Sequence, residues 1–385
     1  MARDDDGRVV FVTGAIPGET VEVEILAAKK DFARGRVTEI VERSPQRDTP
    51  SCAHRRAGCG GCDWMHLQPA AQLEAKVEIV RESLRRIGRL DAGAVDELVV
   101  EGGSVDQFGY RTTIRVVGGP EGTLGFHEQG SDRIVPVTSC PVAASKLSRL
   151  LAVIEVDEGA ELTLRTSVAT GAVTAIWDKR FRRAIRGLPS EVHIGERAWL
   201  TERIAGRDLR VSAGSFFQSG AQAAELLVAA VGRAAPELTT AHHALDAYGG
   251  VGLFAATAMG DVDTVTVVES NPSACRDAEH NLAGRNAHVV RAEVTGWTPP
   301  TGDGPTRRVD VVVADPARPG LGRPGVQALA AAAAPVLVLV SCDPVSLARD
   351  TVLLGDVGYH PERVEVFDLY PNTHHVEAVT RFVRG

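Results

Sequence analysis

Cys342 stands where a cysteine side chain could act as a nucleophile. It follows the apolar run 336–340 and lies in the polar stretch Ser341-Cys342-Asp343-Pro344. A buried cysteine usually behaves as a small hydrophobic side chain, but a thiol in a polar turn after a strand can meet a ligand. A carboxylate close to the thiol would raise its pKa, so we expect Asp343 to face away or to be hydrogen-bonded elsewhere. The segment favours a reactive thiol.

Two acidic residues have similar positions. Asp315 follows the strand pattern 309–314 and is succeeded by Pro-Ala-Arg-Pro-Gly, and Glu377 lies in the apolar pattern 376–379. An acid before proline at the end of a strand is held in an extended loop, where it can reach a ligand. Taken alone, a simple turn explains Asp315 equally well, and an isolated glutamate is usually a surface residue.

A glycine-rich turn indicates a nucleotide site. The strand pattern 244–247 runs into Tyr-Gly-Gly-Val-Gly and then into the helical pattern 251–258, and Glu269 ends the next strand, about 20 residues further on. Glycines let the backbone approach a ligand, the helix N-terminus offers free N–H groups, and an acid at this position binds ribose hydroxyls. Dehydrogenases use the same arrangement, so the turn does not separate a nicotinamide from an adenosyl cofactor.

These residues all lie in the part of the chain after about residue 205, where strand patterns alternate with helical patterns. Such alternation predicts a doubly wound α/β domain with a parallel sheet, whose ligands lie at the carboxyl ends of the strands. The strand patterns are 244–247, 265–269, 309–314 and 335–340, and the helical patterns are 221–234, 251–258 and 325–333.

The first half of the chain reads differently. Residues 8–43 contain short strand patterns typical of a small oligonucleotide-binding (OB-like) β-barrel, and 97–200 again read mostly as strands, after a helical pattern over 69–88. We therefore expect three domains. They are a barrel over 1–46, a cysteine-bearing, β-rich central domain over 47–204, and the α/β domain over 205–385.

Four of the six cysteines form a spaced set. Three lie close together in the sequence and the fourth far downstream, and they are Cys52, Cys59, Cys62 and Cys140. Four thiolates suit either zinc or a [4Fe–4S] cluster, and the spacing does not decide between them. We expect Cys275, on a predicted helix after Glu269, to be a core residue.

Composition limits the classes of function. A net charge of −8 speaks against a protein that coats nucleic acid non-specifically, although Lys179, Arg180, Arg182, Arg183 and Arg186 surround Phe181 in one basic segment. A solvated charge run explains that segment equally well. We find no signal peptide and no apolar stretch of membrane-spanning length, so we expect a cytoplasmic protein with no membrane partner. A monomer is the default expectation.

The motifs, and their order along the chain, resemble those of the uridine-C5 RNA methyltransferases. This is the family of the bacterial ribosomal-RNA and transfer-RNA 5-methyluridine enzymes. The resemblance covers nearly the whole chain. The motifs are Phe216-Phe217-Gln218, the Asp246 glycine loop, Glu269, Asp315-Pro316, Ser341-Cys342-Asp343-Pro344 and His375-Val376-Glu377.

The resemblance implies a role for each matching residue. Cys342 would be the nucleophile that adds to C6 of the uracil, and Glu377 the base that removes the C5 proton. The residues that would contact S-adenosylmethionine, or hold the target base beside it, are Gln218, Tyr248, Glu269 and Asp315.

The resemblance also bears on the cysteines and the RNA. In the ribosomal-RNA members the cysteine pattern holds a [4Fe–4S] cluster, which favours that cluster over zinc, in a structural role. Residues 8–43 resemble the TRAM domain, whose expected first strand is missing or shortened here. The presence of both the cysteine pattern and the barrel favours ribosomal RNA over transfer RNA as the RNA that this protein binds.

Three positions depart from the commonest family pattern, and none removes a reacting group. Ala317 replaces a proline, Asp343 an asparagine, and Leu253 a cofactor-contacting asparagine. Two rival functions remain: a non-catalytic RNA-binding or assembly factor, which would not need Cys342 and Glu377, and a methyltransferase acting on a small molecule or protein, which would have no obvious use for the cysteines.

Overall fold

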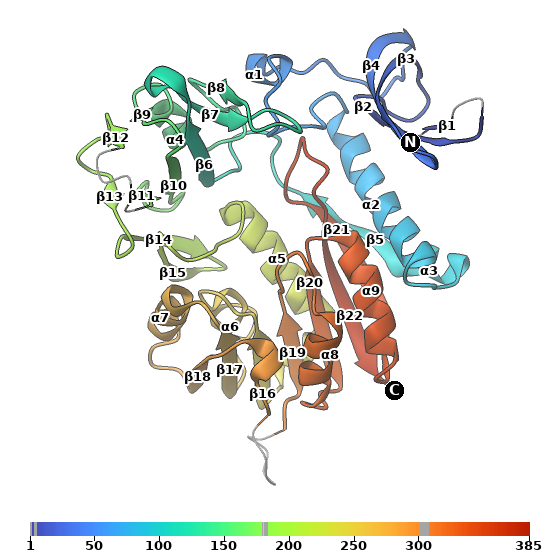
Figure 1. The fold of residues 1–385 in the computed structure, drawn as a ribbon. Helices are drawn as coiled ribbons and strands as arrows, with labels where there is room; N and C mark the ends of the chain where they lie inside the picture. Colours follow the sequence, from blue (N-terminus) through green and yellow to red (C-terminus); the bar gives the residue numbers. More distant parts are fainter. Residues whose placement is uncertain (1, 4–5, 179, 181–183, 300–307) are drawn as a thin grey trace.

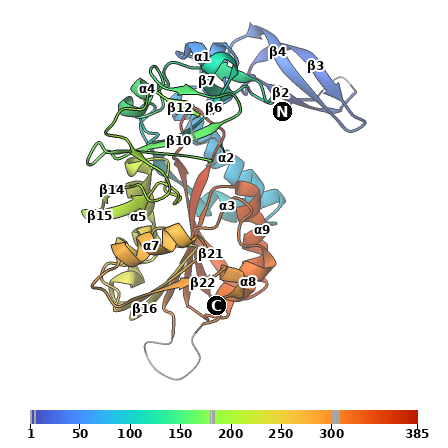
Figure 2. The same ribbon diagram turned by 60° about the vertical axis from the view of Figure 1, so that its left-hand side comes forward.

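The computed structural model places three β-rich parts around one long helix (Figures 1 and 2). A small sheet lies at the N-terminus, a second sheet follows in the middle of the chain, and a large sheet covered by helices contains the C-terminus. None of the helices described is long and apolar enough to cross a membrane. The structure describes residues 2–3, 6–178, 180, 184–299 and 308–385.

The N-terminal sheet contains four strands in the order β1-β2-β4-β3. The first described strand, β1, contains two residues. The sequence analysis predicted a small barrel, whereas here β1 and β3 form the two edges of the sheet. The strands are β1 (Ala2–Arg3), β2 (Val9–Thr13), β3 (Thr20–Ala28) and β4 (Phe32–Glu42).

A helical stretch then leads toward the large sheet, with α1 (Ala53–Arg56), α2 (Pro69–Arg86) and α3 (Ala92–Leu98). The predicted helix over 69–88 is therefore present as α2. Its proline occupies the first helical position, where a missing N–H costs nothing. Apolar residues of α2 at helical spacing are buried against α9 and β21, so α2 connects the first part of the chain to the large sheet.

The central part is a six-stranded sheet in the order β13-β11-β10-β6-β7-β8 with two smaller strand pairs. Of the basic segment predicted there, residues 179 and 181–183 lie outside the described residues. The sheet contains β6 (Thr113–Gly118), β7 (Leu124–His127), β8 (Ile134–Pro136), β10 (Glu161–Thr166), β11 (Val173–Trp177) and β13 (His193–Ile194). Beside it lie α4 (Ser145–Leu150), β9 (Glu155–Val156) with β12 (Ile185–Arg186), and β14 (Trp199–Ile204) with β15 (Arg207–Ser212).

The large sheet has eight strands in the order β18-β17-β16-β19-β20-β22-β21-β5. The five strands from β18 to β20 are parallel, as the sequence predicted, but β22 runs antiparallel to both of its neighbours. The strands are β5 (Val99–Ser104), β16 (His243–Ala247), β17 (Thr264–Glu269), β18 (Ala287–Arg291), β19 (Val311–Ala314), β20 (Val336–Ser341), β21 (Tyr359–Asp368) and β22 (Glu377–Arg384).

Helices cover both faces of this sheet, which confirms the doubly wound fold. Because side chains alternate along a strand, Val311 and Val313 pack into one apolar cluster, and Val312 and Ala314 into the other. The first face is covered by α5 (Ala221–Ala234), α6 (Leu253–Ala256) and α7 (Pro272–Asn281), and the second by α8 (Gly322–Ala330), α9 (Pro344–Gly355), α2 and α3.

The reversal of β22 determines where Glu377 lies. Ser341, at the end of β20, is the register partner of Ala378, the second residue of β22. The start of β22 therefore meets the carboxyl end of β20, and Glu377 reaches the same edge as Cys342. A parallel strand in this place would have carried its first residue to the opposite edge.

One strand of the large sheet comes from far upstream. β5 pairs in parallel with β21, although its residues fall within the range 47–204 that the sequence analysis assigns to the central domain. The described sheet therefore uses residues from both sides of the predicted boundary at residue 205.

We predict that Gly102→Ala in β5 weakens the large sheet. A Cβ at this position would lie 2.3 Å from Cζ of Phe367 in β21, and such overpacking costs about 1–3 kcal/mol. The midpoint of thermal or denaturant unfolding should therefore fall. Gly232→Ala in α5 is the matched control, because no atom lies within 4 Å of the added methyl group, and its midpoint should stay unchanged or rise. Equal midpoints for the two variants would contradict the pairing of β5 with β21.

Candidate functional site

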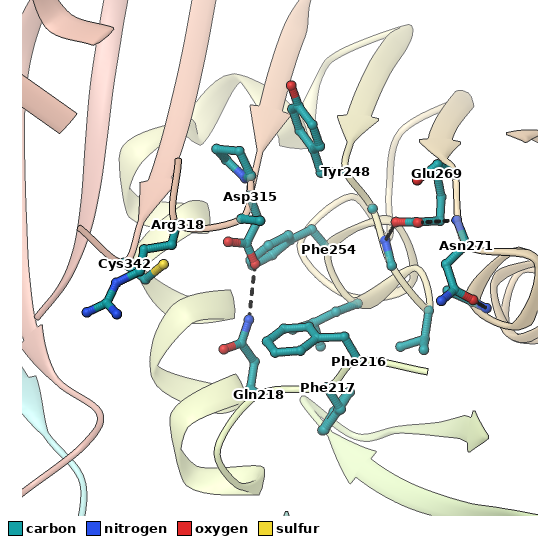
Figure 3. A pocket seen from close by; sticks show the side chains of 18 of the residues that line it. Phe216, Phe217, Gln218, Tyr248, Phe254, Glu269, Asn271, Asp315, Arg318 and Cys342 are labelled. Carbon is teal, nitrogen blue, oxygen red and sulfur yellow. Dashed lines mark hydrogen bonds between the residues drawn. The ribbon is translucent and has the colours of Figure 1, made fainter. Parts of the chain in front are cut away.

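A cavity of about 580 Å³ opens at the carboxyl edge of the large sheet (Figure 3). This volume lies within the range typical of sites for small ligands and cofactors. The loops after β16, β17, β19 and β20, the segment before α5 and the start of β22 all contribute to its wall. The structure brings together in this wall all six residues that the sequence analysis assigned to the active site, namely Gln218, Tyr248, Glu269, Asp315, Cys342 and Glu377.

The glycine-rich turn forms one wall of the cavity. Gly250 and Gly252 have positive φ angles of 55° and 80°, a conformation that glycine adopts without strain. Gly249 is also required by space, since a Cβ there would lie 2.6 Å from the side chain of Val267. Tyr248 has a φ of 60° without being glycine, an uncommon conformation that is concentrated at functional sites.

Glu269 lies at the end of β17 beside this turn. Its carboxylate accepts hydrogen bonds from the backbone N–H of Gly250 at 3.0 Å and from that of Asn271 at 2.6 Å (Figure 3). These bonds fix the orientation of the carboxylate, and each oxygen keeps a lone pair for a further donor. The arrangement suits the hydroxyl groups of a ribose.

Asp246, on the adjacent strand β16, was quoted in the sequence motif but given no role. Its side chain is fully buried, and its Oδ2 accepts from the backbone N–H of Ala255 at 3.0 Å. Burial raises the pKa of this carboxyl group to about 7. Because the bond connects the end of β16 to α6, Asp246 fixes the helix that begins at the glycine turn.

The side chains of Gln218 and Asp315 meet at the wall of the cavity. The amide nitrogen of Gln218 donates to the Asp315 carboxylate at 3.1 Å (Figure 3). Burial raises the pKa of Asp315 to about 7, and the bond from Gln218 opposes this rise. Both groups present hydrogen-bonding atoms to the cavity, where a uracil edge or the polar part of a cofactor could bind.

Buried hydrogen bonds hold the segment that carries Gln218. Asp277 of α7 accepts from the hydroxyl groups of Ser212 and Ser215, each at 2.7 Å. Arg165 of the central sheet donates to the carbonyl oxygen of Ser215 at 2.7 Å. Phe216, in contrast, is 68% exposed, so an aromatic ring stands open at the cavity mouth where a planar group can stack.

Cys342, Asp315 and Glu377 form the reactive corner of the cavity. Burial, followed by the charges of Glu377 and Asp315, raises the pKa of the Cys342 thiol to about 12. Burial and the charge of Asp315 also raise the pKa of Glu377 well above its ordinary range. Two neighbouring buried carboxyl groups do not ionise independently, so a proton is retained between them at higher pH than either would hold alone. A cation bound at this corner would lower all three pKa values.

The expectation for Asp343 is confirmed. Its Oδ1 accepts from the backbone N–H of Ser346 at 2.7 Å, so that Asp343 caps the N-terminus of α9. The negative charge near the Cys342 thiol comes from Glu377 and Asp315 instead.

Several cavity residues had no role assigned from the sequence. Phe216 and Arg318 lay in stretches that the sequence analysis quoted, and these stretches could have suggested their positions. The sequence analysis quoted no motif that assigned a binding role to the other three. The five are Phe216, Phe254, Asn271, Arg318 and Tyr370.

The four cysteines of the spaced set meet at a second, separate cavity, although the sequence places them far apart. The lining of this cavity includes Cys52, Cys59, Cys62 and Cys140. Burial, followed by the charge of Cys140, raises the pKa of Cys62 to about 12, which indicates that the two sulfur atoms are near neighbours. Within the described ranges, no three Cys, His, Asp or Glu side chains are arranged to hold a single metal ion. Cys275 is buried on α7, as expected.

Taken as a whole, the residues of the first cavity can bind a ribose-containing cofactor beside a thiol and two carboxyl groups.

Comparisons with known proteins agree with a site of this kind. A family model described as the TRAM domain matches residues 1–38. The chain is 33% identical to an uncharacterized RNA methyltransferase of Streptomyces avermitilis, over 98% of this chain and 94% of the relative.

Two further relatives have more specific names. A protein of Chromohalobacter salexigens named 23S rRNA (uracil(1939)-C(5))-methyltransferase RlmD is 30% identical, with 100% of this chain and 86% of that protein covered. The crystal structure of Pyrococcus abyssi tRNA (uracil-54, C5)-methyltransferase, solved with S-adenosyl-L-homocysteine, is 26% identical and superposes with a TM-score of 0.72 over 99% of this chain and 98% of that one. The chain belongs to this family of S-adenosylmethionine-dependent RNA methyltransferases.

Proposed function

We propose that this enzyme transfers a methyl group to C5 of a uridine in RNA through a covalent bond between Cys342 and C6 of the base. The observation that carries the proposal is the convergence of Cys342, Glu377 and Asp315 on the wall of the cavity that also contains the glycine turn. A cofactor bound at the turn and a base held at the thiol would share one enclosed space.

The first step explains the need for a nucleophile. C5 of uracil is too weak a nucleophile to attack a methyl group, but addition of the Cys342 thiolate to C6 moves the C5–C6 electron pair into an enolate. Bound S-adenosylmethionine supplies a methyl group on a positively charged sulfur. C5 then forms a bond to that methyl group, and the neutral thioether leaves.

The second step needs a base. C5 of the adduct carries both the new methyl group and its original proton, and Glu377 removes this proton. The released electron pair restores the C5–C6 double bond, the bond from C6 to the Cys342 sulfur breaks, and the thiolate is regenerated. The carboxyl group of Glu377 is buried, so its raised pKa makes it a stronger base than an exposed glutamate. Asp315 shares the proton equilibrium of Glu377 and, with Gln218, would hold the uracil or the cofactor.

We further propose that the four cysteines hold a [4Fe–4S] cluster in a structural role. The fit rests on four thiols that line one cavity. Four thiolates suit either a zinc ion or such a cluster, and the resemblance to the ribosomal-RNA members of the family favours the cluster.

For the RNA, we propose a uridine of 23S ribosomal RNA. The cysteine set and the relative of Chromohalobacter salexigens, whose name specifies 23S rRNA, support this choice. Transfer RNA is the second candidate, because the structure from Pyrococcus abyssi is that of a transfer-RNA enzyme. A uridine of either RNA must leave its stack to reach a thiol that is inside a cavity.

We predict that, with S-adenosylmethionine present, wild-type protein methylates a 23S rRNA fragment and forms a complex stable to denaturation with RNA that contains 5-fluorouridine. Fluorine at C5 cannot be removed as a proton, so the adduct persists. Cys342→Ala should form no complex, whereas Cys275→Ala, which changes a cysteine outside the cavity lining, should react as the wild type does. Gel electrophoresis and methyl incorporation measure both results. An adduct of equal yield with Cys342→Ala would contradict the mechanism, and methylation of transfer RNA alone would contradict the choice of RNA.

We predict that Cys342 reacts slowly with an alkylating reagent at neutral pH and about tenfold faster for each unit of pH up to about 9, because its pKa is raised to about 12. Glu377→Gln removes one of the two carboxyl groups whose charges raise the pKa of the thiol. It should therefore increase the rate at the alkaline end of this range, where Glu377 ionises, and have less effect at neutral pH. A cationic analogue of the cofactor should accelerate alkylation more than neutral S-adenosylhomocysteine does. Mass spectrometry of the Cys342 peptide measures the rates.

The matched control for this experiment is Asp343→Asn. Asparagine also caps helices well, and the Asp343 carboxylate is bound to the α9 backbone rather than to the thiol. Its alkylation rate should therefore equal that of the wild type. A large acceleration in this variant, with none in Glu377→Gln, would show that the charge effect has been assigned to the wrong carboxylate.

We predict that protein purified without oxygen contains about four iron atoms per chain and absorbs visible light. Cys62→Ser should lose both the iron and the absorbance, because it removes one of the four ligands. Cys275→Ser is the control and should retain them, since Cys275 lies in a different part of the fold. Stoichiometric zinc in place of iron, measured by elemental analysis, would refute the cluster.

A further inference from the structure

The loop 369–376 connects β21 to β22 and leads directly into Glu377, the first residue of β22. In Figure 1 it rises from the large sheet toward α2 and the central strands, so that it lies between the C-terminal part of the chain and the part that precedes it. Tyr370, near its beginning, lines the active-site cavity, as does Glu377 itself. The path of this loop therefore sets the position of the carboxylate that the proposed function uses as a base.

Three residues from the first 110 of the chain donate hydrogen bonds to three successive backbone carbonyl groups of this loop. The oxygen of Tyr370 accepts from the Lys76 ammonium group at 3.2 Å, and that of Pro371 from the Tyr110 hydroxyl at 3.1 Å. The oxygen of Asn372 accepts from the backbone N–H of Trp64 at 2.9 Å. The turn of the loop is thus fixed by residues from outside the C-terminal domain.

One face of α2 provides the buried part of this support. Gln72 and Lys76, four residues apart, are both fully buried. The side-chain oxygen of Gln72 accepts from the backbone N–H of Asn372 at 2.6 Å. The ammonium group of Lys76 also donates to the Asp368 carboxylate at 2.6 Å, so that it binds both the end of β21 and the first turn of the loop.

A buried lysine is an expensive way to stabilise a fold. Burial lowers the pKa of Lys76 and raises that of Asp368, so desolvation opposes the charged form of each, while their mutual attraction favours it. Replacing such a pair by apolar side chains is often neutral or even stabilising. Stability alone therefore does not account for Lys76. The bond to the Tyr370 carbonyl gives it a second use, because an apolar side chain cannot make that bond.

We propose that Lys76 is a positioning residue of the methyltransferase: it holds the loop 369–376 and, through it, places the carboxylate of Glu377 over C5 of the methylated adduct. This inference rests on the proposed function, in which Glu377 removes the C5 proton. Lys76 does not line the active-site cavity and acts only through the loop. Loss of Lys76 should therefore slow the release of the adduct, while the adduct continues to form.

The test uses the full-length protein and RNA that contains ordinary uridine. In Lys76→Met, we expect kcat to fall on the order of 100-fold, the effect of displacing a catalytic group by about 1 Å. The KM for RNA should fall together with kcat, so that kcat/KM stays within about twofold of the wild type, because only a step after adduct formation is slowed. The dissociation constant of S-adenosylhomocysteine should also stay within about twofold of the wild type. The complex that survives denaturation, barely detectable with the wild type, should accumulate as it does with Glu377→Gln. Lys76→Arg, which keeps a cation at this place, should recover part of kcat.

Two further variants separate positioning from folding. Lys76→Met/Asp368→Asn removes both charges, leaves neither buried alone and keeps a side-chain oxygen for the backbone N–H of Tyr370, so it should fold and still accumulate the adduct. Lys146→Met, whose ammonium group donates to the carbonyl oxygen of Gly171 in the central part, should retain the wild-type kcat. A double variant with wild-type kcat would overturn the proposal, as would a loss of kcat without accumulation of the adduct. If the wild type and Glu377→Gln both form no adduct, the proposed function itself fails.

Discussion

The antiparallel pairing of β22 with β20 is the constraint on which the active site depends. A thiol after one strand and a carboxylate at the start of the next one in space can meet only if the two strands run in opposite directions. The remaining strands of the site, β16, β17 and β19, are parallel to β20 and deliver their ligand-binding groups at their carboxyl ends. One reversed strand thus adds a buried carboxyl group to the usual ligand edge of a doubly wound sheet.

This reversal also crowds carboxyl groups around the thiol. Burial, followed by the charges of Glu377 and Asp315, raises the pKa of Cys342, which leaves the thiol in its neutral form when no further cation is bound. In the proposed reaction, a sulfonium ion is the positively charged group brought to this corner. Binding of the methyl donor would therefore favour the thiolate, which would limit reaction of the thiol with other electrophiles. The same low-dielectric surroundings strengthen the attraction between the sulfonium and the carboxylates.

Much of the site could be predicted from the sequence, because its residues follow strands whose apolar patterns are clear. Asp315 and Cys342 each follow a buried parallel strand, and local pattern is enough to place them at one edge. The direction of β22 could not be predicted in this way, since an apolar pattern has no direction. The pattern over 251–258 predicted a longer helix than α6, which ends at Ala256, four residues before Gly260.

Long-range contacts account for most of what local pattern missed. β5 reads as a strand of the central region because its neighbours in sequence are strands, yet its partner is β21. The two cavities likewise depend on residues that are distant in sequence, such as Cys140 beside Cys62. Lys76 looked like one of several charges on an amphipathic helix, and only the folded loop beside α2 shows that its ammonium group is buried.

The placement of β5 has a consequence for how the chain acquires its fold. On a ribosome, β5 emerges early, whereas β21 and β22 are among the last segments to appear. Until then β5 has an unpaired edge and α2 has an uncovered apolar face, both of which invite association with other chains. Contacts between segments so distant in sequence also form slowly, because closing a long loop has a large entropic cost. The pairing of β22 with β20 that brings Glu377 to the edge of Cys342 thus belongs to the same late-synthesised part of the chain.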